Sequence, residues 1–345
     1  MKALVYSGVE TLVYRDMEMP TVPEGYEMIR VMASGICGSD MHAYLGHDER
    51  RPAPLILGHE AAGVIVGGPD AGRRVTVNPL VTCGTCRDCV SGRSNLCADR
   101  QIISMPPRQG AFAEYVTMPV SNLVTVPDDI ALKHAALAEP LACGWHGVRL
   151  ALASLGSPAD SLRCLAIGGG AIGLGAALAL VAQGARNVAL VESNDIRRAH
   201  LLEKTDLNIL SPADLEPDTQ FDLVIDGVGF AATRAVASAQ VRPGGVIVHI
   251  GLGENTGGLD IRRMTLQEIT FIGTYTYTAE DFRQTAQAIF DRRFGPLDWV
   301  ETRPLQDGAQ AFADIRSGNV AAPKIVLMPT PNDAVSDSPG DPDDR

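Results

Sequence analysis

Residues 162–173 read Leu162-Arg-Cys-Leu-Ala-Ile-Gly-Gly-Gly-Ala-Ile-Gly173, an apolar run that passes directly into a glycine motif. Leu162–Ile167 predicts a short buried strand, and the apolar residues from Ala171 to Gln183 predict a buried helix that ends before Gly184. A G-x-G-x-x-G motif between a strand and a helix is typical of a parallel α/β sheet that binds a dinucleotide.

The glycine motif predicts how the dinucleotide would be held. The first glycine makes a tight turn, the second lets the diphosphate approach the backbone, and the third lets the helix pack against the strand. The N-terminus of the helix then attracts the negative charge of the diphosphate. The predicted cofactor contacts in this segment are Gly168, Gly170, Ala171, Ile172 and Gly173.

Glu192 predicts which nicotinamide cofactor is used. It lies about 20 residues after Gly173, the spacing typical of this motif, at the end of a predicted strand Asn187–Val191. A carboxylate there accepts hydrogen bonds from the adenosine ribose and repels a 2′-phosphate, which favours NAD. The alternative is an ordinary solvated acid at a strand end. Arg197, a further candidate cofactor contact, and Arg198 weaken the preference because arginine can hold a 2′-phosphate.

Outward from the motif, strands alternate with helices. A helix is expected from about Asp195, and further strands at Phe221–Ile225 and Val246–Ile250. This alternation predicts an α/β fold with a doubly wound parallel sheet. Upstream, Leu132–Leu155 is rich in alanine and leucine and predicts one long helix.

The first 130 residues or so show a different pattern of apolar residues. Short β patterns such as Met28–Met32 and Arg74–Val77 are broken by glycine and proline, which predicts a Greek-key β domain. After a helix at Ala279–Arg292, a closing strand at Lys324–Leu327 is expected to return to that domain. The predicted organisation is a β domain over 1–140, a dinucleotide-binding domain over 141–275, a return over 276–328, and a disordered acidic tail over 329–345.

Composition excludes several classes of protein. Of the 345 residues, 46% are apolar and 20% charged, as in ordinary globular proteins. The net charge of −12 and the lack of a basic cluster argue against a nucleic-acid partner. No run of about 18 apolar residues predicts a membrane span, and the N-terminus lacks the pattern of a signal peptide. We therefore expect a cytoplasmic protein whose seven cysteines stay reduced.

A cluster of four cysteines is the most specific local signal. Cys83, Cys86, Cys89 and Cys97 follow a C-x2-C-x2-C-x7-C pattern on a loop that contains glycine. Four thiolates this close in sequence can form a closed tetrahedral shell around Zn²⁺, which predicts a structural zinc site. The alternatives are a reduced cysteine-rich loop and an iron–sulfur site, but no other feature points to electron transfer.

Three further runs contain metal-binding residue types far apart in the sequence. Cys37 lies in Gly35-Ile-Cys-Gly-Ser-Asp-Met-His42, His59 and Glu60 lie in a G-H-E run, and Glu139 lies in A-E-P-L. Sequence spacing alone does not unite these residues. A single cysteine or histidine in such a position is more often a packing residue than a ligand.

Taken together, these runs resemble the zinc-containing medium-chain alcohol dehydrogenases, most closely their sorbitol/polyol dehydrogenase branch, over about residues 1–328. The resemblance implies a GroES-like β domain carrying two zinc ions and a Rossmann domain carrying NAD. It implies that Cys37 and His59 bind a catalytic zinc and that Glu60 and Glu139 complete its shell. The chain departs from the branch at Thr276–Tyr277, where members often carry an Arg-Tyr pair near the substrate and this sequence has threonine in place of the arginine.

The resemblance also assigns roles around the catalytic zinc. Asp40 matches an acid that orients the zinc-bound histidine, and Ser39 matches a hydroxyl that touches the substrate oxygen. His42 matches the outer end of a proton path to solvent. The alternatives are that Ser39 only satisfies a backbone group and that His42 is a surface residue.

The predicted function is a zinc-dependent oxidoreductase that transfers a hydride between a small secondary alcohol, of polyol or sugar-acid type, and NAD. Two zinc ions per chain, no nucleic-acid or membrane partner, and a homotetramer or homodimer are expected. One alternative is threonine-dehydrogenase-like oxidation of an amino alcohol. Another is a catalytically silent NAD-binding protein, since a fold does not determine a function.

Overall fold

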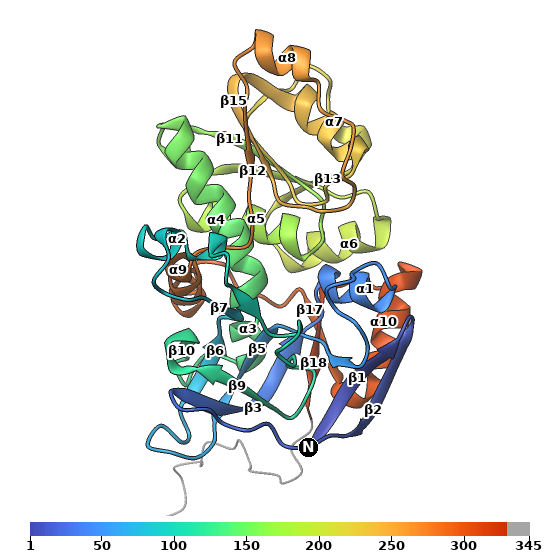
Figure 1. Cartoon of the computed structure of the whole chain (residues 1–345). Helices are drawn as coiled ribbons and strands as arrows, with labels where there is room; N and C mark the ends of the chain where they lie inside the picture. The colour runs from blue at the N-terminus through green and yellow to red at the C-terminus, as the bar shows by residue number, and fades with distance from the viewer. Residues whose placement is uncertain (330–345) are drawn as a thin grey trace, which may run out of the picture.

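The computed structural model describes residues 1–329, which form two lobes, each built on its own main β-sheet (Figure 1). The upper lobe in Figure 1 comes from the middle of the chain, and the lower lobe combines the N-terminal and C-terminal parts. The predicted acidic tail lies, apart from Pro329, outside the described residues.

The upper sheet confirms the predicted doubly wound architecture. Its six strands are ordered β13-β12-β11-β14-β15-β16, and every neighbouring pair is parallel. The chain order reverses on the two sides of β11, so a crevice opens at the carboxyl ends of the strands there. The strands are β11 (Arg163–Ile167), β12 (Asn187–Val191), β13 (Asn208–Leu210), β14 (Phe221–Asp226), β15 (Val241–His249) and β16 (Thr270–Gly273), and the helices between them are α5 (Ala171–Ala182), α6 (Asp195–Lys204), α7 (Ala231–Gln240) and α8 (Ile261–Leu266).

The lower lobe is mainly β-structure. Its largest sheet has the order β10-β6-β5-β3-β18-β17, with β9 also paired to β3. The last strand, β18, runs antiparallel to β3, so the C-terminal part of the described chain joins the first lobe. The strands of the lobe are β1 (Lys2–Gly8), β2 (Thr11–Asp16), β3 (Tyr26–Gly35), β4 (Leu55–Ile56), β5 (Glu60–Ile65), β6 (Arg74–Val77), β7 (Leu80–Val81), β8 (Gln101–Ile102), β9 (Tyr115–Pro119), β10 (Leu123–Thr125), β17 (Val300–Pro304) and β18 (Lys324–Met328), and its helices are α1 (Gly38–Tyr44), α2 (Arg87–Val90) and α10 (Gly308–Ser317).

The single long helix predicted over Leu132–Leu155 is wrong. The structure has a short α3 (Leu132–Ala135) and a separate α4 (Ala138–Leu155). Pro140 explains the break, because a proline has no N–H to donate and its ring clashes with the carbonyl four residues earlier. Starting α4 at Ala138 places Pro140 in the first turn, where no intrahelical donor is needed.

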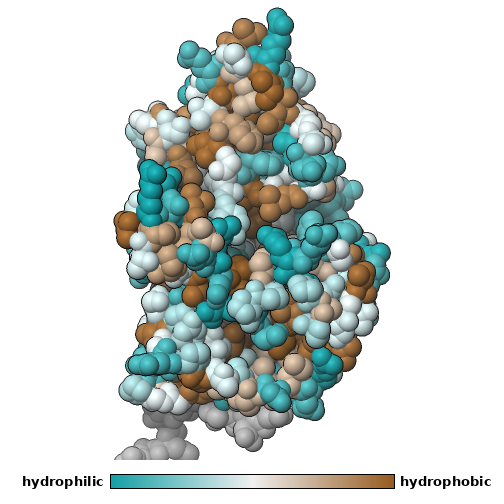
Figure 2. Space-filling view, in the orientation of Figure 1, coloured by the Kyte–Doolittle hydropathy of each residue, from teal (hydrophilic) through white to brown (hydrophobic). Residues whose placement is uncertain are grey.

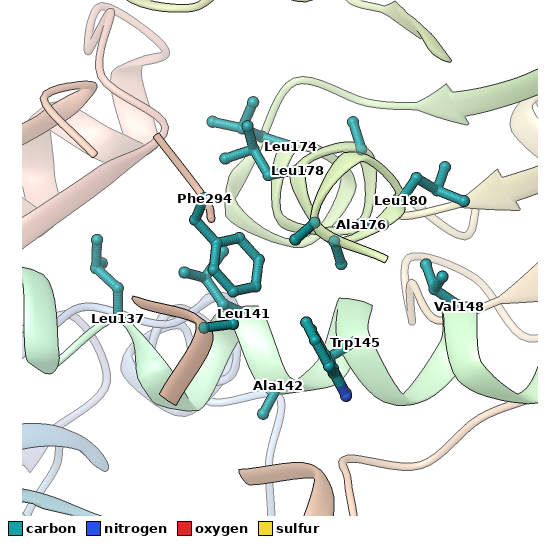
Figure 3. Packing of buried hydrophobic residues seen from close by; sticks show 14 of the residues in the cluster. Leu137, Leu141, Ala142, Trp145, Val148, Leu174, Ala176, Leu178, Leu180 and Phe294 are labelled. Atoms are coloured by element: carbon teal, nitrogen blue, oxygen red, sulfur yellow. The ribbon is translucent and has the colours of Figure 1, made fainter. Parts of the chain in front are cut away.

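Helix α4 packs against α5 in the core of the upper lobe (Figure 3). Both helices contribute buried apolar side chains, and Trp145 of α4 lies against the Phe294 ring, with 6.0 Å between the ring centroids. Gly144 lets the two backbones come close, because a Cβ at that position would lie 2.7 Å from the backbone nitrogen of Ala176. This contact holds the first turn of α4, which carries Glu139, against the lobe that would bind a dinucleotide.

A buried ion pair fixes α4 to α9 (Ala279–Phe290). The Asp281 carboxylate lies 2.8 Å from His146 Nδ1 and accepts hydrogen bonds from Arg149 Nε at 2.6 Å and from the Thr278 hydroxyl at 2.6 Å. Burial alone would raise the pKa of Asp281, but these three partners hold it well below its ordinary value.

We expect Asp281→Asn to lower the free energy of unfolding by about 2–3 kcal/mol. This loss is smaller than for a fully buried ion pair, because Arg149 is partly exposed and solvent weakens its interaction with Asp281. A folded-state pKa below the unfolded value makes this contribution present above about pH 4 and lost as the pH falls further. Urea unfolding at pH 7 and pH 3 measures both effects, with the exposed Asp16→Asn as the control. A gap between wild type and Asp281→Asn that is as large at pH 3 as at pH 7 would contradict this explanation.

No helix within residues 1–329 is long and apolar enough to cross a membrane.

Candidate metal and cofactor sites

The turn from β3 into α1 positions the first candidate ligand, Cys37. Cys37 is the N-cap of α1, and its backbone N–H donates to Asp40 Oδ2 at 3.0 Å. The other Asp40 oxygen accepts the Gly58 N–H at 3.2 Å and lies 3.5 Å from His59 Nδ1. One fully buried carboxylate therefore ties the loop of Cys37 to the loop of His59, although about twenty residues separate them in sequence.

Cys37, His59 and Glu60 form a compact group of metal-binding side chains. One ligand atom from each residue lies within 4.8 Å of the others. His59 Nδ1 faces Asp40 and also the Ser104 hydroxyl, which is 3.3 Å away. Because Nδ1 is held by these partners, Nε2 is the ring nitrogen left to bind a metal.

The Glu60 carboxylate shows that this group fits a cation. Its Oε1 accepts a hydrogen bond from Lys324 Nζ at 2.6 Å, whereas Oε2 is buried and has no hydrogen-bond partner within residues 1–329. Gly35 leaves room for that oxygen, since a Cβ there would lie 2.0 Å from it. A buried carboxylate oxygen without a partner is costly, and a bound metal ion beside Cys37 and His59 would satisfy it.

Glu139 lies near this group but outside its tightest part. It is buried, and its Oε1 accepts a hydrogen bond from the Tyr277 hydroxyl at 2.8 Å. Burial raises its pKa to about 7, His59 opposes that rise, and the negative charge of Glu60 adds to it. Cys37, His59 and Glu60 have ligand atoms within 4.8 Å of one another. Glu139, the fourth predicted ligand, is not part of this group.

Cys83, Cys86, Cys89 and Cys97 form the second group. Their sulfur atoms lie within 4.8 Å of one another, with Cys83 Sγ 3.6 Å from Cys97 Sγ and 3.9 Å from Cys89 Sγ. Backbone N–H groups lower the pKa of Cys83 to about 6, whereas burial and the neighbouring thiol groups raise that of Cys89 to about 12. Four converging thiols, with no histidine or carboxylate joining the group within residues 1–329, fit a closed tetrahedral zinc shell.

The glycine motif forms the turn that the sequence predicts. Gly168 has φ +98°, and a Cβ at Gly173 would lie 1.9 Å from the Gly168 carbonyl oxygen, so glycine is needed at both positions. Ala171 and Ile172 begin α5, with Gly170 as its N-cap. This turn borders a cavity of about 880 Å³ at the switch point of the sheet.

Glu192 lines that cavity, and both of its carboxylate oxygens accept hydrogen bonds from backbone N–H groups. Its Oε2 accepts the Gly169 N–H at 2.8 Å, its Oε1 accepts the Asn194 N–H at 2.6 Å, and Arg197 NH1 is 3.7 Å from Oε2. Glu192 therefore helps to fix the glycine turn as well as placing a negative charge at the strand end. The same carboxylate partly neutralises the positive charge of Arg197.

Two family models match the chain. One is described as the alcohol dehydrogenase GroES-like domain and matches residues 23–128, and the other is described as zinc-binding dehydrogenase and matches residues 171–291. L-Galactonate-5-dehydrogenase of Escherichia coli strain K12 is 32% identical over 302 residues, covering 83% of this chain and 86% of its own. Sorbitol dehydrogenase of Bacillus subtilis strain 168 is 32% identical over 332 residues, covering 90% of this chain and 93% of its own. The chain belongs to the zinc-binding alcohol dehydrogenase family.

The fold of this dehydrogenase is shared with solved structures. A crystal structure from Escherichia coli CFT073, described as a short chain alcohol dehydrogenase complexed with NADH, is 25% identical to it, with a TM-score of 0.84. The alignment covers 95% of this chain and 99% of that one. The predicted combination of a GroES-like and a Rossmann domain, and the resemblance to the polyol branch, are confirmed by these matches.

Ser39 and His42 of the dehydrogenase lie on α1, directly after Cys37. Ser39 is half-buried, His42 is exposed, and no hydrogen bond among residues 1–329 involves the Ser39 hydroxyl or links the two side chains. The Ser39 carbonyl accepts from Arg51 NH1 at 3.1 Å. The structure thus leaves the Ser39 hydroxyl free for another partner.

Sequence reasoning missed three residues around the metal group: Lys324, Ser104 and Arg51. Lys324 is buried, donates to Glu60 Oε1 and to the Ile36 carbonyl, and lies in the closing strand predicted at Lys324–Leu327. Ser104 and Arg51 are in segments without any motif. The sequence does contain one signal for Lys324, because a lysine in an apolar closing strand needs an acidic partner when the strand is buried.

Figure 2 shows a hollow across the middle of one face, between the two lobes, with hydrophilic residues on its rim. Near the four-cysteine loop, Asn95 donates to the Tyr275 carbonyl at 2.8 Å and the Ala279 N–H donates to the Ser94 hydroxyl at 3.1 Å, so this part of the loop contacts the segment that follows β16.

Proposed function

We propose that this dehydrogenase transfers a hydride between a secondary alcohol, of polyol or sugar-acid type, and NAD. One zinc ion would be held by Cys37, His59 and Glu60, with Glu139 beside it, and a second by the four cysteines of the Cys83–Cys97 loop. The observation that carries the proposal is Glu60 Oε2, which is buried beside a thiol and an imidazole and has no hydrogen-bond partner among the described residues. The names of the two relatives support the substrate type.

The two groups would serve different purposes. When bound, the first zinc would act as a Lewis acid that makes a substrate hydroxyl more acidic, and NAD would accept the hydride. Asp40 holds the His59 ring in one orientation, and the Lys324 ammonium balances the charge of Glu60. The Ser39 hydroxyl would relay the substrate proton by accepting it and releasing its own, and His42, at the outer end of the relay, would release a proton to solvent. The four-cysteine site would only stabilise its loop.

A spectrophotometric assay tests the proposal. Zinc-loaded protein is mixed with NAD and a panel of polyols, sugar acids and L-threonine, and NADH formation is followed. Turnover of a polyol or sugar acid supports the proposal, and turnover of L-threonine alone would favour the amino-alcohol alternative. No turnover with any member would favour a silent NAD-binding protein.

We expect NAD to have a higher kcat/KM than NADP, because the Glu192 charge repels a 2′-phosphate. Glu192→Gln keeps the side-chain size, removes the charge and gives up one of the two backbone hydrogen bonds of Glu192. The ratio of kcat/KM for NAD over NADP should fall by about tenfold, which corresponds to one modest electrostatic contact. The control is Glu203→Gln, an exposed acid on α6. A wild-type preference for NADP would contradict the assignment and implicate Arg197.

We also propose a homo-oligomer in a reducing, cytoplasmic location. All seven cysteines lie within the described residues and none of them forms a disulfide there, which supports the location. Strand β16 is the last strand of its sheet, and Phe271 on it and the nearby Leu252 and Tyr275 are exposed, which supports association. Light scattering at micromolar concentration tests the oligomer, and a monomeric mass would refute it.

A further inference from the structure

The four-cysteine loop bonds the segment that follows β16 at two points. The Asn95 side-chain amide donates to the Tyr275 carbonyl at 2.8 Å, and the Ser94 hydroxyl accepts the Ala279 N–H at 3.1 Å. Ser94 and Asn95 lie between the third and the fourth cysteine, and Asn95 is buried. Figure 1 shows helix α2 of this loop beside α9, which begins at Ala279. The segment from Tyr275 to Ala279 is therefore bonded to the loop at both of its ends.

Arg100, three residues after the last of the four cysteines, adds a third contact to this segment. Its guanidinium group lies over the Tyr275 ring, 4.8 Å from the ring centroid, and its Nε donates to the Tyr275 hydroxyl at 3.3 Å. Its NH1 donates back to the Cys97 carbonyl at 2.8 Å. Because Arg100 joins Tyr275 to Cys97, the position of segment 275–279 depends on the conformation of the four-cysteine loop.

Thr276 has a backbone conformation that needs such contacts. Its φ is +47°, in the left-handed region that a β-branched residue rarely adopts. A conformation of this kind persists where the surrounding structure holds it in place. The hydrogen bonds at Tyr275 and Ala279 lie on the two sides of Thr276, so they hold the turn that leads into Tyr277.

Tyr277 stands in the middle of the segment and contacts the candidate catalytic site. It lies two residues after Tyr275 and two before Ala279, and its side chain is buried. Its hydroxyl donates to Glu139 Oε1 at 2.8 Å. The orientation of the Glu139 carboxylate beside the metal group therefore depends on the position of Tyr277, which the loop holds from both sides.

We propose that Ser94 and Asn95 are positioning residues that act through Tyr277 on Glu139 beside the candidate catalytic metal group. The zinc of the four cysteines stabilises its loop, and the residues of the loop set the geometry of the reaction site. A misplacement of about 1 Å, caused far from the chemistry, can lower a rate by about a hundredfold. The inference rests on the proposed dehydrogenase function and extends it to residues outside the site.

Asn95→Ala removes the donor to Tyr275 and leaves the four cysteines in place. We expect kcat with a polyol or sugar acid to fall by about tenfold or more. The KM for NAD should change little, because the dinucleotide crevice lies at the glycine motif. Metal analysis should find two zinc ions, and NADH fluorescence should give the wild-type dissociation constant. Hydrogen exchange of the peptide that contains segment 275–279 should be faster than in the wild type, since the segment is partly released.

A double-mutant cycle with Tyr277→Phe tests whether Asn95 acts through Tyr277. Tyr277→Phe removes the donor to Glu139 and should itself lower kcat by about tenfold. In the Tyr277→Phe background, Asn95→Ala should then lower kcat by less than about threefold, because the hydroxyl that Asn95 positions is already gone. Two residues that affect the reaction independently would give losses that multiply.

Ser94→Ala is an independent and milder test, because it removes only the hydroxyl that accepts the Ala279 N–H. It should lower kcat by about fivefold, as the loss of one hydrogen bond does, and less in the Tyr277→Phe background. It decides the question if Asn95→Ala loses zinc or fails to fold. Ser91→Ala is the matched control. Ser91 lies in the same loop, is exposed and donates to the Asp88 carbonyl at 3.2 Å, so kcat should stay at the wild-type value.

The failure of this inference is distinct from that of the proposed function. Wild-type kcat in Asn95→Ala and Ser94→Ala, or losses that multiply with that of Tyr277→Phe, would overturn the positioning role and leave the dehydrogenase function intact. An equal loss in Ser91→Ala would show a general effect of the loop and also overturn it. A wild-type enzyme that oxidises none of the alcohols would overturn the proposed function, and this inference with it.

Discussion

Replacing His59 by alanine should leave about one zinc ion per chain and lower kcat/KM by about 10⁴-fold or more. His59 supplies one of three converging donors, and with only Cys37 and Glu60 left the group no longer fits a tightly bound zinc. A Lewis acid is worth several kcal/mol to such a reaction, and each 1.36 kcal/mol is a factor of ten. Metal analysis and steady-state kinetics on the same preparation measure both effects.

Two controls separate the metal groups. His134→Ala removes a histidine whose Nε2 lies 3.7 Å from Asp298 and which belongs to neither metal-binding group, so it should keep two zinc ions and full activity. Cys86→Ser should lose the other zinc and destabilise the Cys83–Cys97 loop. His59→Ala protein with two zinc ions and wild-type kcat/KM would show that the Cys37–His59–Glu60 group is not the catalytic site.

Ser39→Ala should lower kcat by about 10²–10⁴-fold while both zinc ions stay bound, since positioned proton transfer typically contributes that much. The Ser39 hydroxyl is not used in any hydrogen bond of the described chain, and it stands two residues from Cys37. His42→Ala should cost less and mainly below about pH 8, because hydroxide accepts the proton directly at higher pH. The exposure of His42 fits this outer position.

The pH profiles of kcat for both variants, with metal content, decide between a relay and two unrelated residues. Ser39→Thr keeps a hydroxyl and should recover part of the activity lost in Ser39→Ala. Unchanged kcat in fully metal-loaded Ser39→Ala would rule out the relay. An equal loss in His42→Ala at all pH values would assign His42 a role other than accepting the proton.

Features encoded by neighbouring residues were predictable from the sequence. The glycine motif between a strand and a helix predicted the crevice at β11, and the spacing of Cys83, Cys86, Cys89 and Cys97 predicted their cluster. Both features are short loops whose geometry depends on few residues. The helix predicted over Leu132–Leu155 is interrupted for an equally local reason, because Pro140 does not fit the interior of a helix even where alanine and leucine favour one.

The Cys37–His59–Glu60 group needed the tertiary structure, or a resemblance, to be assembled. Its members come from different turns that Asp40 draws together, and no spacing rule relates them. Lys324 joins them from 264 residues away, because β18 pairs with β3 and carries its side chain to Glu60. A sequence determines local turns and periodicity directly, whereas contacts between distant segments depend on the packing of whole sheets, and only the folded chain decides which buried charges meet.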